Sequence, residues 1–191
     1  MSADDVQIRR LGEPGDLGWV IMSHGEIYAA EFGWDASFEA LVAGIVADYA
    51  ADPPQAGASA WIAELKGRRA GCVFLVPAPT PGVAKLRILL VHPRARGRAL
   101  GSRLVATAIE FATAFGYNRV ELWTNRPLAA ARRIYLRHGF ALTDEEPHHS
   151  FGVDLIGQTY SLTLPVCTGH AGRPARRRSA AGGGSVPTTG A

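Results

Sequence analysis

The sequence predicts an α/β fold, a single mixed β-sheet with helices on its faces, in the order β-α-α-β-β-β-α-β-α-β-β. Three observations lead to this prediction. Short segments alternate apolar and polar residues, longer segments repeat apolar residues at helical spacing, and glycine or proline stands at most boundaries. We expect residues 1–164 to form one domain, because no spacer interrupts the pattern and this length can bury one ordinary core.

The first half of the chain predicts a strand, two helices and a hairpin. Alternating apolar and polar residues predict the strand over 6–11. Apolar residues at helical spacing predict helices over 16–32 and 37–49, and Pro53–Pro54 stops the second of them. A Lys-Gly-Arg turn between two apolar segments predicts a hairpin with strands over 59–65 and 69–76.

The second half of the chain predicts alternating strands and helices. Residues 83–91 (VAKLRILLV) end in an apolar run, which is typical of a central strand buried on both faces, and Pro93 prevents its continuation. The apolar positions of the next segment fall on one side of a helix that Gly116 ends. We expect helices over 100–115 and 127–138 and strands over 119–125, 141–147 and 157–164.

The positive charge of the chain lies in its C-terminal segment. The formal net charge is +3, from 20 Lys and Arg against 17 Asp and Glu. Four arginines lie between residues 173 and 178 in a segment without acids, so residues 1–164 carry a charge of about −1. The body of the chain is therefore not expected to bind nucleic acid. Residues 165–191, rich in Arg and Gly, are expected to be a disordered tail, with weak polyanion binding as the alternative to a solvated appendage.

The composition also indicates where the protein works. No apolar run is long enough to span a bilayer, and the first ten residues lack the charged-then-apolar order of an export signal. Two cysteines, Cys72 in an apolar segment and Cys167 in the tail, indicate no disulfide framework. We therefore expect a cytoplasmic protein with no membrane partner. No spacing of ligands supports a metal site, so none is predicted.

The segment VHPRARGRALGSRL, residues 91–104, predicts an anion-binding site. It follows a buried strand and opens a helix, where small residues leave backbone N–H groups uncovered and the helix dipole favours negative charge. Its arginines can pair with phosphate oxygens. The Lys and Ser/Thr of a P-loop and the GxGxxG pattern of dinucleotide-binding folds are missing, which disfavours both classes. An arginine-rich helix start without a ligand stays open as the alternative.

Two motifs in this half resemble those of the Gcn5-related N-acetyltransferases (GNAT). Residues 96–101 (RGRALG) fit the R/Q-x-x-G-x-G/A motif for acetyl-CoA, with Ala99 where glycine is commoner. Residues 131–140 (ARRIYLRHGF) fit the second signature, A-x-x-x-Y-x-x-x-G-F, with Tyr135 as its tyrosine. The resemblance implies the GNAT acyl-CoA N-acyltransferase fold over residues 6–164, with acetyl-CoA as co-substrate. The cofactor contacts that it implies are Leu90, Val91, Arg96, Gly97, Arg98, Ala99, Leu100, Gly101, Ser102, Asn125, Arg132 and Tyr135.

The resemblance has a narrower form and one departure. EFGWDASFEALVAGIVADY, AWIAELKGRRAGCVFLV and EEPHHSFGVDLIGQTY are similar to the acetyltransferase half of proteins that fuse it to a MarR-type winged-helix regulator. Only a few residues precede the first strand, so we expect the DNA-binding half to be absent. Many members have asparagine seven residues before the tyrosine, whereas this chain has Leu128 there and Asn125 three residues earlier.

The reaction that the resemblance implies is direct attack of a primary amine on the thioester of acetyl-CoA. The backbone of Leu90 or Val91 is the implied oxyanion donor, and Tyr135 is the implied acid for the departing thiolate. A tyrosine of pKa about 10 is a weaker acid than a thiol of about 8.5, so full transfer is uphill by about 2 kcal/mol. We therefore interpret Tyr135 as a hydrogen-bond donor to the thiolate. Packing of its ring between helix and sheet is the structural alternative.

The amine must also lose a proton, and the implied bases are His148 and His149. In the family the loop between the last two strands and the first two helices line the acceptor site, which adds Tyr28, Glu31 and Trp34 as implied substrate contacts. Adjacent residues of an extended segment point to opposite sides, so only one histidine is expected to serve.

Several alternatives stay open on the sequence alone. A non-catalytic module of the same fold, sensing acetyl-CoA or a small ligand, is the alternative to an enzyme, and the intact Arg96 and Tyr135 favour the enzyme. The acceptor is a small molecule, an amino acid or a peptide amine. The oligomeric state is open, a homodimer included. Trp123 is expected in the core or in a pocket wall.

Overall fold

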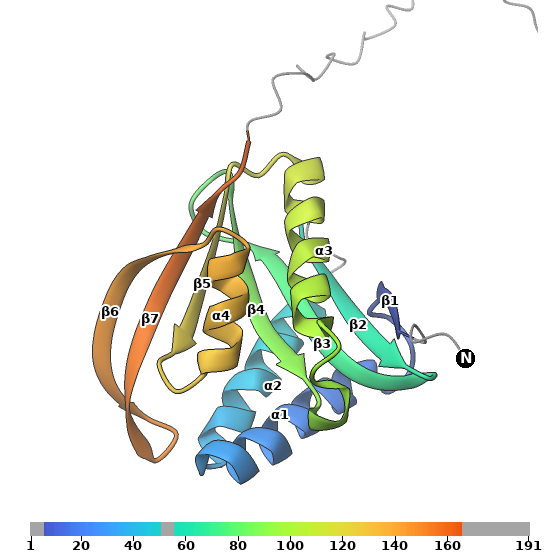
Figure 1. The fold of residues 1–191 in the computed structure, drawn as a ribbon, viewed down its shortest axis with the longest axis vertical. Helices are drawn as coiled ribbons and strands as arrows, with labels where there is room; N and C mark the ends of the chain where they lie inside the picture. Colours follow the sequence, from blue (N-terminus) through green and yellow to red (C-terminus); the bar gives the residue numbers. More distant parts are fainter. Residues whose placement is uncertain (1–5, 51–55, 166–191) are drawn as a thin grey trace, which may run out of the picture.

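The computed structural model describes residues 6–50 and 56–165 (Figure 1). Its strands are β1 (Val6–Arg10), β2 (Ser59–Leu65), β3 (Arg68–Pro77), β4 (Val83–Val91), β5 (Arg119–Asn125), β6 (Ala141–Ser150) and β7 (Val153–Thr163). Its α-helices are α1 (Asp16–Phe32), α2 (Ala36–Ala50), α3 (Leu100–Phe115) and α4 (Ala129–Arg137), with a short 3-10 turn over Pro93–Ala95. The predicted order of elements is confirmed. The expected helix stop at Pro53–Pro54 and the tail after residue 165 lie outside the described residues.

The seven strands form one mixed sheet in the order β1-β2-β3-β4-β5-β7-β6. The pair β4–β5 is parallel, and the other five neighbouring pairs are antiparallel. Helices α3 and α4 cover one face of the sheet, and α1 and α2 cover the other (Figure 1). Each face buries its own hydrophobic cluster, as a three-layer α/β domain requires. The predicted fold class is confirmed.

A β-bulge in β4 opens the sheet at its centre. Leu86 faces the core under α3 and α4, but Ile88 has a φ of 43° and the pairing with β3 shifts by one residue there. The shift turns Leu90 toward the opposite core, below α1 and α2. Pairing with β5 stops at Leu86, and the two strands separate beyond it (Figure 1). The strand is central, as predicted, and its second half contacts both cores, Leu89 and Val91 on one face and Ile88 and Leu90 on the other. Of these four residues only Leu90 is fully buried.

The start of α1 is anchored by a buried ion-pair cluster. Asp16 is only 1% exposed and accepts from Arg9 at 2.8 Å and from Arg69 at 2.7 Å. Burial raises the pKa of this carboxyl, but hydrogen bonds from Arg9, the Gly12 N–H and Arg69 outweigh it and hold the pKa well below its usual range. The cluster ties α1 to β1 and β3. Gly33, with a φ of 69°, then ends α1.

The hairpin β6–β7 is longer than the sequence predicted. Its strands continue to a two-residue turn at Phe151 and Gly152, with φ of 59° and 78°. Such turns usually contain Asn-Gly or Asp-Gly. Here phenylalanine takes the first position in the left-handed region, so the sequence does not indicate the turn. His148 and His149 therefore lie on strand β6, not in a loop between shorter strands.

Candidate active site

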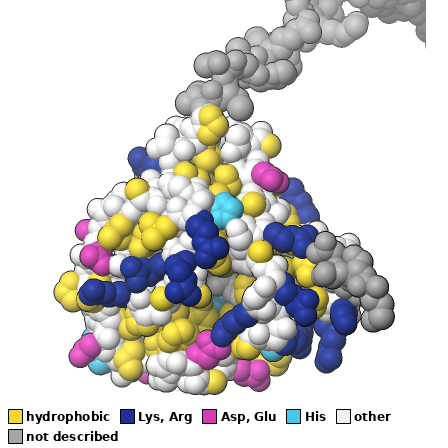
Figure 2. Space-filling model, in the orientation of Figure 1, with side chains coloured by type: hydrophobic (Ala, Val, Ile, Leu, Met, Phe, Trp, Pro, Cys, Tyr) yellow, Lys and Arg dark blue, Asp and Glu magenta, His cyan; other side chains and the backbone are white. Residues whose placement is uncertain are grey.

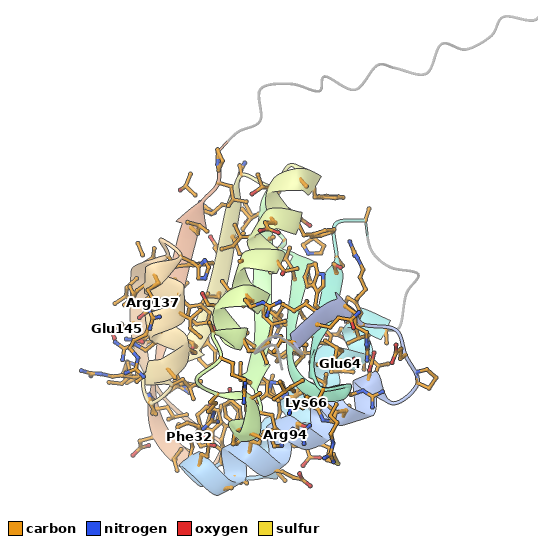
Figure 3. All side chains as sticks on the ribbon, turned by 45° about the vertical axis from the view of Figure 1, so that its right-hand side comes forward. Phe32, Glu64, Lys66, Arg94, Arg137 and Glu145 are labelled. Carbon is orange, nitrogen blue, oxygen red and sulfur yellow. The ribbon has the colours of Figure 1, made fainter. Side chains whose placement is uncertain are left out.

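A first cavity of about 660 Å³ lies where β4 and β5 separate. Its walls come from the end of α1, the end of β4, the start of α3 and one side of α4. Phe32 of α1 and Arg137 of α4, both labelled in Figure 3, line it from two of these elements. The first cavity therefore lies at the gap between the strands, on the face of the sheet that α3 and α4 cover.

The start of α3 presents its backbone to this first cavity. Ala99 is the N-cap residue, in the left-handed region with a φ of 55°, and no side chain caps the helix. The N–H groups of the first turn, Leu100 to Ser102, are left without helical acceptors, since the ladder begins with Arg103 N–H donating to Ala99. A Cβ on Gly101 would lie 2.7 Å from Ile134, so glycine lets α4 pack closely here. The arrangement suits an anion.

Arginines surround the uncapped end of α3. Figure 2 shows Lys and Arg side chains gathered across the face that carries α4, next to hydrophobic surface. Arg96, Arg133 and Arg137 line the first cavity. Arg96 is also paired with Glu31 of α1, with Nη2 and Oε1 2.8 Å apart. Glu31, expected at the acceptor, therefore lies in the first cavity.

Four of the expected cofactor contacts do not line this cavity: Asn125 and Tyr135, which line a second cavity, and Arg98 and Arg132. Arg98 is exposed and outside its lining. Arg132 turns toward Tyr160, donating to its hydroxyl at 3.3 Å. The sequence interpretation missed Arg133 and Arg137, although their spacing of four residues indicates one side of a helix.

A second cavity of about 520 Å³ lies on the other side of the gap. It is bounded by α1, α2, β4, β5, α4 and the β6–β7 hairpin. The two cavities have four lining residues in common: Tyr28, Leu89, Leu128 and Ala131. They therefore meet at the opening between β4 and β5, and a molecule in one can reach a molecule in the other there.

Tyr135 stands in the wall of the second cavity. It is 5% exposed and packs against Phe140 and Tyr160, with ring centroids 5.8 and 6.3 Å apart. Burial raises the pKa of its hydroxyl above the ordinary value. Tyr135 therefore packs its ring between α4 and the sheet and also forms part of the wall of the second cavity.

The adjacent histidines of β6 point to opposite sides, as predicted. His148 lines the second cavity; its Nε2 is 2.9 Å from Asn125 Oδ1 and its Nδ1 is 2.9 Å from Ser150 Oγ. His149 has a side chain that is 69% exposed and pairs with Asp154 at 2.7 Å. Asn125, expected to contact the cofactor, instead lines the second cavity and fixes His148.

Aromatic side chains form part of the remaining wall of the second cavity. Trp34 is buried in a cluster with Tyr28, Phe38 and Phe151, with centroid distances of 4.7 to 5.1 Å around it. Trp123 is 38% exposed and contacts the His148 ring at a centroid distance of 5.3 Å. Trp123 is thus a pocket wall, one of the two positions expected for it.

The backbone of β4 offers an N–H group to the opening. His92 N–H donates to the Ala70 carbonyl of β3 at 2.9 Å, and Leu90 of β4 is paired with Cys72 of β3. Alternate residues of a strand direct their N–H groups to opposite edges. The N–H of Val91 therefore faces the open edge, whereas that of Leu90 faces β3. Of the two expected oxyanion donors, the register favours Val91.

Residues 6–50 and 56–165 hold neither a candidate metal site nor a membrane-spanning helix. No group of three or more His, Cys, Asp or Glu there could hold a metal ion. Within the same ranges, no helix combines the length and apolar character needed to cross a membrane. Cys72, the free cysteine of this part of the chain, is buried, and burial raises the pKa of its thiol.

Comparisons with known proteins agree with this geometry. The profile of the acetyltransferase (GNAT) family matches residues 21–140. The chain is 31% identical over 154 residues to an uncharacterized N-acetyltransferase of Schizosaccharomyces pombe, covering 78% of this chain and 91% of that protein. It is 30% identical over 125 residues to N-acetyltransferase 8B of Homo sapiens, covering 62% of this chain and 54% of that protein. The chain thus spans most of the yeast relative and about half of the human one.

Solved structures share the fold at lower identity. The yncA protein of Salmonella typhimurium, solved with its cofactor acetyl-CoA, has a TM-score of 0.67 at 22% identity, covering 90% of this chain and 99% of that one. An N-acetyltransferase of Staphylococcus aureus Mu50 has a TM-score of 0.68 at 16% identity, covering 85% and 100%. The chain therefore belongs to the acetyltransferase (GNAT) family and is an acetyl-CoA-dependent N-acetyltransferase.

Proposed function

We propose that this acetyltransferase moves the acetyl group of acetyl-CoA directly to a primary amine, with the cofactor in the first cavity and the amine in the second. One observation carries the proposal. The two cavities meet where β4 and β5 separate, with the uncapped start of α3 on one side and Tyr135 on the other. A small molecule, an amino acid or a peptide can supply the amine.

The first cavity fits the pyrophosphate of a coenzyme A thioester. The N–H groups of Leu100 to Ser102 and the three lining arginines supply donors and positive charge together. A diphosphate would pair with the start of α3 and with Arg133 and Arg137. None of these groups has an acidic partner among the described residues. Arg96 would exchange Glu31 for the phosphate or bridge the two.

The transfer requires one bond to form and one to break. The amine lone pair attacks the thioester carbonyl carbon, the C–N bond forms, and the C–S bond breaks with its electron pair leaving on sulfur. The N–H of Val91 is the donor that we assign to the carbonyl oxygen as it becomes negative. The amine releases one proton, and the thiolate is protonated on release.

Tyr135 suits hydrogen bonding to the thiolate better than proton transfer to it. An ordinary tyrosine is already a weaker acid than a thiol, and burial raises the pKa of Tyr135 further. The raised pKa keeps the proton on the tyrosine oxygen, so that the hydroxyl donates a hydrogen bond and does not give its proton up. We therefore assign Tyr135 as a donor that stabilises the leaving sulfur.

His148 is the base that the geometry supports. With Asn125 Oδ1 accepting from Nε2, the ring leaves Nδ1 as an acceptor for the Ser150 hydroxyl. Uptake of a proton at Nδ1 then requires Ser150 to turn its hydroxyl away. His148 and Ser150 both line the second cavity, so the proton can pass from the amine through Ser150 or a water molecule.

Two measurements test this proposal. Acetyl-CoA should raise the melting temperature of the protein, because a ligand that binds only the folded state stabilises it. A broad panel of primary amines should then include acceptors that release free thiol from acetyl-CoA. The absence of a melting shift at millimolar acetyl-CoA would overturn the proposal. Binding without turnover on any amine would instead favour the ligand-sensing module.

Other predictions from the sequence keep that status. The narrower similarity to the acetyltransferase half of MarR fusion proteins rests on the three segments quoted for it. The cytoplasmic location, the homodimer and the boundary at residue 164 likewise stay predictions. The location, the oligomeric state and the boundary can each be measured on the full chain.

A further inference from the structure

The second cavity contains a cation that the acetyl transfer does not use. Arg87 of β4 is partly buried and lines this cavity, and burial lowers the pKa of its guanidinium. Asp48 of α2 acts on it from a distance, but no ion pair within 4.0 Å forms with it in the described part of the chain. By contrast, Arg9, Arg69 and Arg96 each hold a carboxylate at 2.7 to 2.8 Å. A partly buried guanidinium without a partner is costly unless a ligand supplies the anion.

A buried ring nitrogen in the same wall also lacks a partner. His24 of α1 is almost fully buried and lines the second cavity. Its Nδ1 is 2.7 Å from the Val20 carbonyl, which makes Nδ1 the donor, while Nε2 has no hydrogen-bond partner among the described residues. Burial lowers the pKa of His24 to about 4, so the ring is neutral near pH 7 and Nε2 is an acceptor. This atom is satisfied by a ligand that brings an N–H or O–H group.

The charges of the second cavity are separated between its walls. Lys85 and Arg87 on β4 supply the positive charge, and Glu146 on β6 supplies the carboxylate. The wall between them is apolar and largely aromatic. A molecule with a carboxylate and an apolar body matches the part of this cavity that lies between β4 and the aromatic cluster. The volume of about 520 Å³ is within the range of small-molecule sites.

We infer that the acceptor is a free α-amino acid with an apolar side chain, preferably aromatic, whose carboxylate pairs with Arg87. Arg87 lies two residues before Leu89, which borders both cavities, a distance of roughly 7 Å along a strand. An arginine side chain can therefore hold the carboxylate while the neighbouring amine reaches the opening. The aromatic group then lies against the cluster of Trp34 and Phe38. The inference rests on the proposed function and adds the substrate class.

The test compares amino acids with partners that lack the carboxylate. We expect kcat/KM for L-phenylalanine and L-tryptophan to exceed that for their carboxamides and for phenethylamine and tryptamine by about tenfold or more, since a charge-assisted bond is lost. Arg87→Gln should raise KM for the two amino acids by about tenfold and leave the carboxamides nearly unchanged. Arg68→Gln, at the exposed β2–β3 turn, is the matched control and should change neither series.

The outcomes separate this inference from the proposed function. A melting shift with acetyl-CoA that Arg87→Gln retains shows that the variant folds and binds the cofactor. If wild-type protein acetylates the carboxamides as well as the acids, or if Arg87→Gln weakens both series equally, the carboxylate assignment is wrong. The assignment also fails if polyamines or lysine peptides are acetylated and none of the amino acids is. Failure of acetyl-CoA itself to bind would remove the proposed function first.

Discussion

The two cavities are built in different ways although they meet at one opening. The first uses backbone N–H groups from a continuous segment, residues 96–102, supported by one side of α4. The second uses side chains from α1, α2, β4, β5 and β6, which are far apart in the sequence. Backbone groups tolerate side-chain substitution, whereas a wall of side chains changes with each one. The first cavity therefore suits a constant ligand, and the second suits an acceptor that differs among proteins of one fold.

This difference makes the boundary between the cavities the most sensitive place. Tyr28, Leu89, Leu128 and Ala131 border both, and Tyr135 stands just beside them. A change at the boundary should affect the chemical step, since both reactants meet there. A change that removes only a binding contact, away from the boundary and from the groups of the chemical step, should affect the KM of its own ligand.

Removing the Tyr135 hydroxyl should give the largest effect. We expect Tyr135→Phe to lower kcat by roughly a hundredfold or more, in the range found when one donor to a developing negative charge is removed, because the leaving sulfur loses its donor. The ring still packs against Phe140, so the melting shift with acetyl-CoA should persist. Stopped-time thiol release and thermal melting measure the two quantities.

A second tyrosine provides the control for this change. Tyr117 is buried, and its hydroxyl donates to the Gly57 carbonyl at 3.0 Å, away from both cavities. Tyr117→Phe should cost about 1 kcal/mol of stability and leave kcat within twofold. Equal kcat losses in the two variants would contradict the assignment of Tyr135 to the chemistry.

The adjacent histidines of β6, His148 and His149, should show the next largest effect. His148→Gln is expected to lower kcat/KM by about a hundredfold, since it removes the base held by Asn125 and Ser150. His149→Gln should change kcat/KM by less than twofold, because that side chain is exposed and pairs with Asp154. Initial rates across a pH series on both variants measure this. A loss of similar size at His149 would show that the hairpin, not the histidine, matters.

The same contrast explains how far the sequence could be interpreted. The segment that opens the first cavity could be picked out from the sequence as a candidate anion site, because glycine, small residues and a buried strand before a helix are local signals. Arg132 was expected at the cofactor and turns instead to Tyr160, since only the packed helix decides which arginine faces α3. The role of Asn125 as a partner of His148 depends on the pairing of β5, β7 and β6, a non-local arrangement. The same holds for the place of Arg87 in the second cavity, which depends on the separation of β4 from β5 beyond Leu86.

The arginines of α4 should give a smaller effect that is confined to the cofactor. We expect the double variant Arg133→Gln and Arg137→Gln to raise KM for acetyl-CoA about tenfold, because two exposed charges near the phosphates contribute about 1 kcal/mol each or less. KM for the amine and kcat should stay within twofold. The effect should shrink as salt screens the charges. A rise in the amine KM instead would mean that the two cavities are not separate in function.

Ala99 should give the smallest effect, and it tests the backbone construction of the first cavity most directly. Alanine with a φ of 55° is strained, whereas glycine adopts this conformation readily. We expect Ala99→Gly to raise the free energy of unfolding by about 0.5–1 kcal/mol in urea titrations, with KM for acetyl-CoA unchanged within twofold. Gly97→Ala is the reciprocal control: at a φ of 78° it should lower stability, although a Cβ there would meet no atom within 4 Å. If Ala99→Gly weakened both stability and cofactor binding, the left-handed N-cap would not be what holds the start of α3 open, and side chains would have to replace the backbone as the binding groups of the first cavity.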